Sequence, residues 1–213
     1  MNLILAGGGS GKQTVKVNTL FTSLLKNRDI LYIPTARSYM QDDKECFKWV
    51  NGELGEYGDF NITLVTEDDL KSISYDDLVG YGGVFIGGGN TFYLLQQLRV
   101  TGFDIKLVKL LSDTDIPVMG GSAGALIFGK SIKTAEPYDE NFVNLKDLNG
   151  LNMVNGSNIW VHYVDSMKDL VKEYTELLKT KIICIPEDGG LYIRNMNEDG
   201  EEIGNIKTID PSP

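Results

Sequence analysis

Short apolar runs rich in β-branched and aromatic residues alternate with longer amphipathic stretches along most of the chain. The apolar runs predict strands at Asn2–Ala6, Ile30–Pro34, Asn61–Val65, Gly83–Ile86, Ile116–Met119, Ser157–His162 and Lys181–Ile185. Helical periodicity covers Gln13–Lys26, Tyr39–Glu56, Thr91–Val100, Asp104–Ser112, Ala123–Phe128 and Ser166–Lys179. Because this alternation is typical of βαβ units, it predicts an α/β fold with a mostly parallel sheet and helices on both faces.

The pattern changes after Pro186, where "LYIRN" and "EEIGNIKTI" flank a polar turn at Asn197–Gly200. This spacing predicts an edge hairpin near the C-terminus. Neither an internal repeat nor a linker interrupts the chain, and its 213 residues are enough for a sizeable core. We therefore expect residues 1–213 to form a single domain.

Composition restricts the class of partner. The net charge is −10, from 30 acidic and 20 basic residues, which disfavours nucleic acid and anionic membranes because both require a basic footprint. No apolar run has the length of a membrane span. The two cysteines, Cys46 and Cys184, form neither a disulfide framework nor a metal-binding spacing. The first residues lead directly into a strand without the pattern of a signal peptide, so the expected location is cytoplasmic.

The first predicted strand runs into "LILAGGGSGKQT", residues 3–14, which has the outline of a phosphate-binding loop. Such a loop requires G-x-x-x-x-G-K-[ST], and aligning its GK pair on Gly11 and Lys12 puts Ala6 at the first glycine and Gln13 at the magnesium-binding hydroxyl. The dinucleotide pattern G-x-G-x-x-G fails as well. We interpret the stretch as a tight turn that lines a cleft, because ligands of open α/β sheets gather at the carboxyl ends of strands.

A stronger motif lies in "MGGSAGALIFG", residues 119–129, where Gly120 to Gly124 read G-x-S-x-G. The motif follows a predicted strand and precedes a predicted helix, which is the context of a nucleophile elbow with Ser122 at its turn. The start of that helix would offer free N–H groups to a developing oxyanion. The alternative is a plain glycine-rich turn between a strand and a helix.

A serine nucleophile needs a base, and the chain contains one histidine, His162, at the end of the predicted strand in "SNIWVHY". If an imidazole activates Ser122, it belongs to His162. A histidine satisfied at a strand end is the structural alternative.

Two further predicted strands end in groups that a hydrolase can use. In "FIGGGNTFYLL", residues 85–95, Gly87 to Gly89 can bring backbone N–H groups close to a substrate, and Asn90 fits the N-cap of the next helix. In "IICIPEDGG", Glu187 lies just past a strand, although turn chemistry alone explains the flanking residues. All of these groups fall at carboxyl ends of predicted strands, which share one edge of a parallel sheet. We therefore expect them to converge on one site.

At these stretches the chain resembles a family of serine peptidases that includes dipeptidase E (aspartyl dipeptidase) and cyanophycinase. The segments that carry the resemblance are "IGGGNTFYLL", "MGGSAGALIFG", "VHYVD" and "IPEDGGLYI", in this order, and together they span about residues 30–193. The resemblance implies a glutamine-amidotransferase-like three-layer α/β sandwich and a serine-type peptidase acting on short peptides, without a cofactor or metal.

The same resemblance assigns roles to individual residues. It implies that Ser122 is the nucleophile and His162 the base. The oxyanion hole would be formed by the N–H groups of Ala123 and of the Gly88–Gly89 pair. Asn90 and Thr91 are the candidate substrate-binding residues.

The acid of the implied triad has three candidates. The family's Pro-Glu-Gly element matches Pro186 and Glu187, with Asp188 inserted before the glycine, and we favour Glu187. Family members carry a second acid after the elbow helix, and here "KTAEPYD" offers Glu136 and Asp139 as alternatives.

The expected specificity departs from that of the family's aspartyl dipeptidases, which carry a longer basic segment between the histidine motif and the next helix. Here "HYVDSMKDLVKEY" runs almost directly into that helix, with Lys168 between two aspartates. Arg37 and Arg194 follow other strands and are not placed by the sequence. We therefore predict little or no preference for an N-terminal Asp.

Two other classes of function stay open at this stage. One is a catalytically silent member of the fold that binds a small ligand in the same cleft, because fold does not dictate function. The other is a nucleotide-binding protein that uses the Gly7–Lys12 turn. The sequence also leaves a homodimer open.

Overall fold

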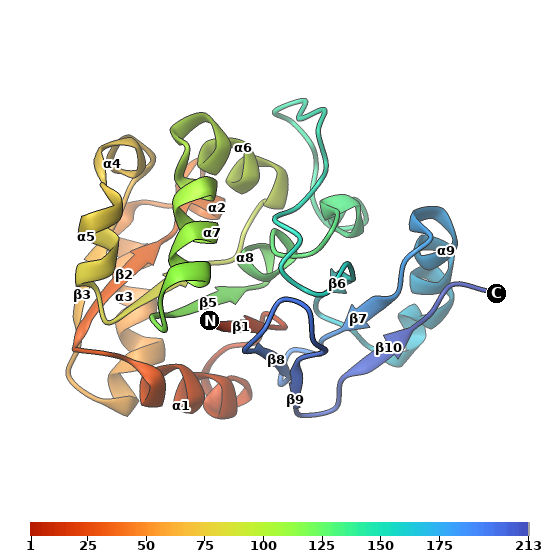
Figure 1. Ribbon diagram of the computed structural model, residues 1–213, viewed down its shortest axis with the longest axis horizontal. Coiled ribbons are helices and arrows are strands. Elements are labelled where there is room, and N and C mark those ends of the chain that lie inside the picture. The colour runs from red at the N-terminus through yellow and green to blue at the C-terminus, as the bar shows by residue number, and fades with distance from the viewer. Residues whose placement is uncertain (213) are drawn as a thin grey trace.

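The computed structural model describes residues 1–212 and contains a seven-stranded sheet with the order β3-β2-β4-β5-β1-β8-β9 (Figure 1). Its five parallel strands are β1 (Asn2–Ala6), β2 (Asp29–Ile33), β3 (Asn61–Leu64), β4 (Gly83–Ile86) and β5 (Pro117–Gly121). The antiparallel strands β8 (Gly190–Ile193) and β9 (Glu201–Ile203) form the predicted hairpin at one edge. The expected mostly parallel α/β fold is therefore confirmed.

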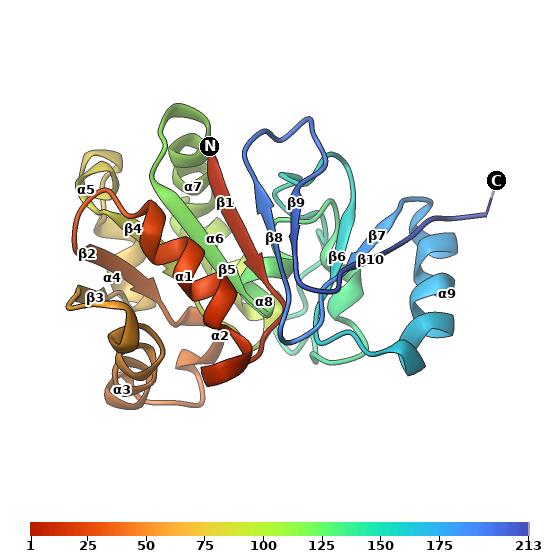
Figure 2. The same ribbon diagram turned by 90° about the horizontal axis from the view of Figure 1, so that it is seen from below.

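A second sheet of three strands has the order β10-β7-β6, with β6 at Asn158–Trp160, β7 at Ile182–Cys184 and β10 at Lys207–Ile209. We expected the strands at β6 and β7 to belong to the main sheet, and this expectation was wrong. The edge of β1 that they would join is taken by β8, which pairs antiparallel along Leu3 to Ala6. The carboxyl ends of β6 and β7 nevertheless point back towards those of β1 and β5 (Figure 2).

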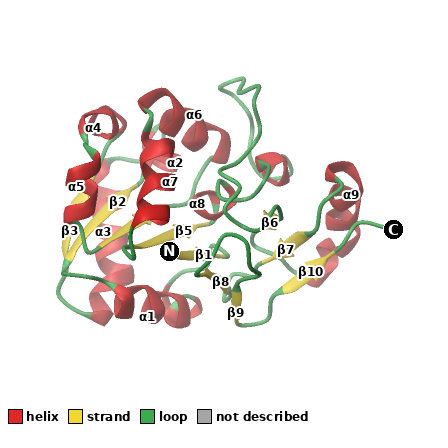
Figure 3. Ribbon diagram, in the orientation of Figure 1, coloured by secondary structure: helices red, strands yellow, loops and turns green. Residues whose placement is uncertain are grey.

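Helices cover both faces of the main sheet, as Figures 1 and 3 show. They are α1 (Val15–Leu24), α2 (Thr35–Ser38), α3 (Asp43–Leu54), α4 (Glu67–Ser72), α5 (Tyr75–Gly80), α6 (Thr91–Thr101), α7 (Phe103–Asp113), α8 (Ala123–Leu126) and α9 (Lys168–Leu178). Short 3-10 turns lie at Gly11–Gln13, Gly55–Tyr57, Ile132–Ala135 and Asp165–Met167. In the part of the chain that the structure describes, no helix is long and apolar enough to cross a membrane.

Alternating residues of the central strands pack into two separate hydrophobic cores, one on each face of the sheet. In β1, Leu3 and Leu5 pack into the core under α6 and α7, whereas Ile4 and Ala6 pack into the core under α1 and α3. This alternation follows from the two-residue period of a strand, and burial on both faces explains why β1 reads as a continuous apolar run. The three-stranded sheet adds a smaller cluster around Trp160 and Val171.

Helices α4 and α5 were not predicted, because each is only six residues long. Both begin with a capping box, in which Asp69 bonds back to Thr66 and Asp77 bonds back to Ser74. The helix expected from Tyr39 to Glu56 is shorter in the structure, where α3 spans Asp43–Leu54. Residues 39–42 leave the helical path, and Asp42 caps the start of α3 by accepting a hydrogen bond from the N–H of Glu45 at 2.9 Å.

Candidate active site

Ser122 lies on a strained turn between β5 and α8, with φ 50° and ψ −112°. A non-glycine residue rarely adopts such a backbone conformation, and surrounding contacts must hold it there. The Ser122 N–H donates to the carbonyl of Ala6 at 3.1 Å. At Gly124, a Cβ atom would come within 2.4 Å of the Ile86 carbonyl oxygen, so only glycine lets the helix approach β4 this closely. The geometry is that of a nucleophile elbow.

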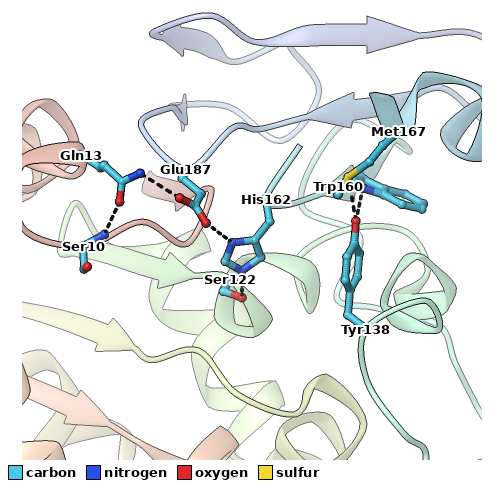
Figure 4. A network of polar contacts seen from close by, with 8 residues as sticks. All are labelled: Ser10, Gln13, Ser122, Tyr138, Trp160, His162, Met167 and Glu187. Atoms are coloured by element: carbon cyan, nitrogen blue, oxygen red, sulfur yellow. Dashed lines mark hydrogen bonds and ion pairs between the residues drawn. The ribbon is translucent and has the colours of Figure 1, made fainter. Parts of the chain in front are cut away.

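The imidazole of His162 faces the Ser122 hydroxyl, with 2.9 Å between Nε2 and Oγ (Figure 4). His162 follows β6 and also has a positive φ, 52°, which its N–H stabilises by donating to the carbonyl of Gly7 at 2.9 Å. Two residues earlier, the fully buried Trp160 donates from its indole nitrogen to the Tyr138 hydroxyl at 2.8 Å. The strand that carries the histidine is thus anchored just before it turns into the site.

Glu187 lies on the far side of the imidazole, with 3.3 Å between its Oε1 and Nδ1 of His162. Its other oxygen accepts a hydrogen bond from Nε2 of Gln13 at 2.8 Å, and Ser10 in turn donates to Gln13 (Figure 4). The bond from Gln13 and then the bond to His162 hold the pKa of Glu187 below its usual value. Glu187 therefore stays ionised and keeps a negative charge beside the imidazole at neutral pH.

The glycine-rich turn after β1 lies directly beneath these groups. The N–H of Gly7 donates to the carbonyl of Gly189 at 3.1 Å, and the N–H of Gly9 donates to the carbonyl of Glu187 at 3.2 Å. With the bond from His162 to Gly7, the turn is tied to the segments that carry both the histidine and the glutamate. The sequence did not reveal that this turn contacts both segments, nor that Gln13 bonds to Glu187, because no local motif marks contacts between residues far apart in the chain.

The loop after β4 brings backbone amides to the other side of Ser122. A Cβ atom at Gly88 would lie 3.0 Å from Cβ and 3.5 Å from Oγ of Ser122, so the Gly88 backbone runs alongside the Ser122 side chain. Within residues 1–212, the N–H groups of Gly88 and Ala123 have no acceptor. Gly89 has φ 144° and packs against the carbonyl of Ala36. Free amides on both sides of a serine are what an oxyanion hole requires.

The two alternative acids, Glu136 and Asp139, make no hydrogen bond to His162 among the residues described. Asp139 accepts the N–H of Thr91 at 2.8 Å, and burial raises the pKa of Asp139 more than that bond lowers it. Glu136 is exposed and accepts from the Tyr174 hydroxyl at 3.3 Å.

Asn90 and Thr91 are both buried, and they lie outside the set of residues that line the cavity at Ser122. Asn90 caps α6 through Oδ1 and donates from Nδ2 to the carbonyl of Glu140 at 2.8 Å. These contacts hold the segment that carries Asp139 against the start of α6.

A cavity of about 90 Å³ opens beside Ser122 and His162. Its side-chain walls come from Tyr32, Arg37, Cys46, Trp49, Glu53 and Phe85. Arg37, which the sequence left unplaced, also lines a wider hollow of about 680 Å³ that contains Asp139 and Phe142. Arg194 lies elsewhere, paired with Glu201 at 3.2 Å, and Lys168 is exposed at the start of α9.

Residues that resemble a phosphate loop are engaged with the protein itself. The N–H of Gly11 donates to both carboxylate oxygens of Glu53, at 2.9 and 3.1 Å. Over residues 1–212, no three His, Cys, Asp or Glu side chains gather as a metal site.

The model of peptidase family S51 matches residues 3–199 of this chain. An uncharacterized peptidase of Listeria monocytogenes is 29% identical over 210 residues, which cover 91% of this chain and 94% of that protein. Peptidase E of Haemophilus influenzae is 28% identical over 185 residues, covering 82% and 81% of the two chains. A solved structure from Listeria monocytogenes has a TM-score of 0.70 at 24% identity and covers 99% of this chain and 98% of its own.

Proposed function

Because the chain belongs to peptidase family S51 and is a serine-type peptidase, we propose that Ser122, His162 and Glu187 are its catalytic triad and that it hydrolyses short peptides. The observation that carries this proposal is the continuous path from Oγ of Ser122 to Nε2 of His162, and from Nδ1 to the Glu187 carboxylate, at 2.9 and 3.3 Å. Each group stands in the order that general-base catalysis by a triad requires.

In the proposed reaction, the Ser122 oxygen attacks the scissile carbonyl carbon while His162 takes the hydroxyl proton at Nε2. The Glu187 carboxylate holds the Nδ1–H tautomer and stabilises the imidazolium that forms. The N–H groups of Gly88 and Ala123 bind the carbonyl oxygen as it becomes an oxyanion. Collapse of this intermediate breaks the C–N bond, and His162 gives its proton to the departing amine.

The resulting acyl-serine ester is hydrolysed by the reverse use of the same groups. A water molecule loses a proton to Nε2 of His162 and attacks the ester carbonyl. Collapse of the second tetrahedral intermediate returns the proton to the Ser122 oxygen and releases the acid. Both halves are stepwise acyl transfer and need no group beyond the residues named here.

We assign Asp139, Asn90 and Thr91 to positioning. Asp139 and Thr91 bond to one another across the start of α6, and Asn90 bonds to the carbonyl next to Asp139 in sequence. These bonds hold residues 139–140 near the loop that carries Gly88 and Gly89. In this proposal the glutamate, and neither Asp139 nor Glu136, is the acid of the triad.

The choice of short peptides follows from the resemblance to the dipeptidase E family. The cavity of about 90 Å³ beside Ser122 offers a place for a substrate side chain. The hydrophobic core also supports one domain over the full chain, because Ile159 and Ile183 of the second sheet pack in the same cluster as Leu3 and Ile86 of the first.

We propose a cytoplasmic location, because two free, buried cysteines fit a reducing compartment.

The proposal is tested with a panel of di- to tetrapeptides, with the released amines quantified for the parent enzyme and for Ser122→Ala. We expect turnover by the parent and a loss of at least about a thousandfold in the variant. If the folded parent cleaves nothing on the panel, the protein is a silent ligand-binding member of the fold instead.

A further inference from the structure

Three aromatic rings from three different elements wall the cavity beside Ser122. Tyr32 of β2, Trp49 of α3 and Phe85 of β4 contact one another, with ring centroids 5.4 to 6.2 Å apart. Met119 and Cys46, which are almost fully buried, add to this apolar surface, and the polar side chains of Thr14, Asn18 and Gln41 also line the cavity. Such walls favour an apolar occupant, because burying its surface removes that surface from water without leaving polar groups unpaired.

The charged groups of the cavity cancel. Glu53 contributes one negative charge, and both of its oxygens are already bonded, to the N–H of Gly11 and to the Thr14 hydroxyl. Arg37 contributes one positive charge, and its exposed side chain stands at the mouth, where the wider hollow begins. A charged side chain that enters the cavity would lose its hydration and would find no net opposite charge to compensate for that loss.

Tyr32 also brings a polar group, its hydroxyl, to the cavity wall. The Tyr32 side chain is only 4% exposed, and its hydroxyl makes no hydrogen bond within the described part of the chain. A Cβ atom at Gly87 would lie 2.9 Å from this hydroxyl, which therefore sits at the edge of the loop that carries Gly88. Burial raises the pKa of Tyr32, so the hydroxyl stays protonated and can donate to a main-chain carbonyl that passes this edge.

Resting on the proposed function, we propose that this cavity binds the side chain of the residue that supplies the scissile carbonyl, and that it selects an uncharged aliphatic side chain of about the size of Val or Leu. The Cα of that residue is one bond from the carbon attacked by Ser122. Its side chain is thus the one nearest to the cavity mouth between Ser122 and Gly88. We expect the three rings to leave too little width for an indole, and the cavity carries no net charge to hold an Asp or Lys side chain.

The first test compares X-Gly dipeptides that share one leaving group, with X as Ala, Val, Leu, Trp, Asp or Lys. We expect kcat/KM for Leu-Gly to exceed that for Ala-Gly by about 10- to 100-fold, in line with the known effect of added methylenes in an apolar pocket. Asp-Gly, Lys-Gly and Trp-Gly should fall at or below Ala-Gly. If Asp-Gly leads the series and loses its lead in Arg37→Met, the cavity is an anion site and the proposal is wrong.

Variants of the wall provide the matched comparison. Trp49→Ala should reduce the Leu-over-Ala ratio by roughly tenfold. Phe47→Ala is the control, because Phe47 is exposed on the same helix and lies outside the cavity lining. Tyr32→Phe keeps the ring and should preserve the Leu-over-Ala ratio while lowering kcat/KM for all X-Gly substrates alike. A ratio unchanged in Trp49→Ala would contradict the proposed pocket.

Binding without turnover separates this proposal from the catalytic one. In Ser122→Ala, titration with Leu-Gly and Asp-Gly should change the fluorescence of Trp49, with Leu-Gly binding at least about tenfold more tightly. The signal should disappear in Ser122→Ala/Trp49→Phe, since the remaining Trp160 is buried away from the cavity. If wild type cleaves no peptide but this preference is seen, the proposed catalysis fails and the pocket stands. Equal affinities for the two dipeptides would overturn the pocket whatever the turnover.

Discussion

The Cα of Gly8 lies against the imidazole of His162, so closely that a Cβ atom there would come within 2.3 Å of Cε1 and 2.6 Å of Nε2. Gly8 also has φ 105°, outside the range that other residues normally adopt. We therefore expect Gly8→Ala to push the ring away from Ser122 and to lower kcat/KM by roughly 100-fold or more.

Gly11→Ala is the matched control for this variant. Gly11 lies in the same turn and also has a positive φ, 55°, but no atom lies within 4 Å of its missing Cβ. It should lose about 1–2 kcal/mol of unfolding free energy to backbone strain while keeping most of its activity. Equal activity losses in the two variants would mean that the turn matters for stability and not for the position of His162.

Exchange of the three candidate acids distinguishes the triad member. Glu187→Gln removes the charge beside Nδ1 and allows the wrong imidazole tautomer, so kcat should fall on the order of 10⁴-fold. Glu136→Gln and Asp139→Asn should each have a far smaller effect, and melting temperatures should show that all three variants fold. A larger loss in Asp139→Asn than in Glu187→Gln would move the acid to the segment after the elbow.

The buried carboxyl of Asp139 predicts a pH-dependent effect on stability. Burial raises the pKa of Asp139 in the native state. The folded protein therefore binds this proton more tightly than the unfolded chain does. The free energy of unfolding then decreases as pH rises from the unfolded pKa to the native pKa. Asn can still accept the N–H of Thr91 but carries no charge. Asp139→Asn should therefore melt above the parent at about pH 7, and the difference should vanish towards about pH 3. A difference that persists or grows in acid would refute this assignment of cause.

The glycine-rich turn should not bind nucleoside triphosphates. Its Gly11 N–H already donates to the Glu53 carboxylate, whose negative charge repels a phosphate at this place. Isothermal titration with ATP and magnesium should show no saturable binding at micromolar concentrations, and Lys12→Ala should behave like the parent. Saturable binding that disappears in Lys12→Ala would restore the nucleotide-binding alternative.

The positions of most strands could be predicted from the periodicity of apolar and polar residues alone. Strands β1 and β4 occur at the predicted residues, and the remaining predicted strands differ by one or two residues at their ends. The elbow at Ser122 was recognisable because its strand–turn–helix context and its small residues are local in sequence. The separate sheet of β6, β7 and β10 was not, since strand pairing is decided by which edge is free, and β8 occupies the edge beside β1.

The site was predictable only where its chemistry is local. Ser122, His162 and Glu187 could be singled out as candidates because each lies at or just past the end of a predicted strand. Gln13 and Gly8 could not, because their contacts cross more than a hundred residues of chain. The aromatic wall of the cavity could not be predicted for the same reason. In the sequence, Tyr32, Trp49 and Phe85 are ordinary core residues of three different elements, and only the folded chain brings their rings together.

The central claim, that His162 activates Ser122 as a nucleophile, is tested most directly by labelling with a fluorophosphonate followed by peptide mapping. The parent should be modified at Ser122, and His162→Ala should lose most of its reactivity while remaining folded by circular dichroism, because no base would then lie 2.9 Å from the hydroxyl. A folded parent that stays unlabelled, or a His162→Ala variant that is labelled as fast as the parent, would contradict the account.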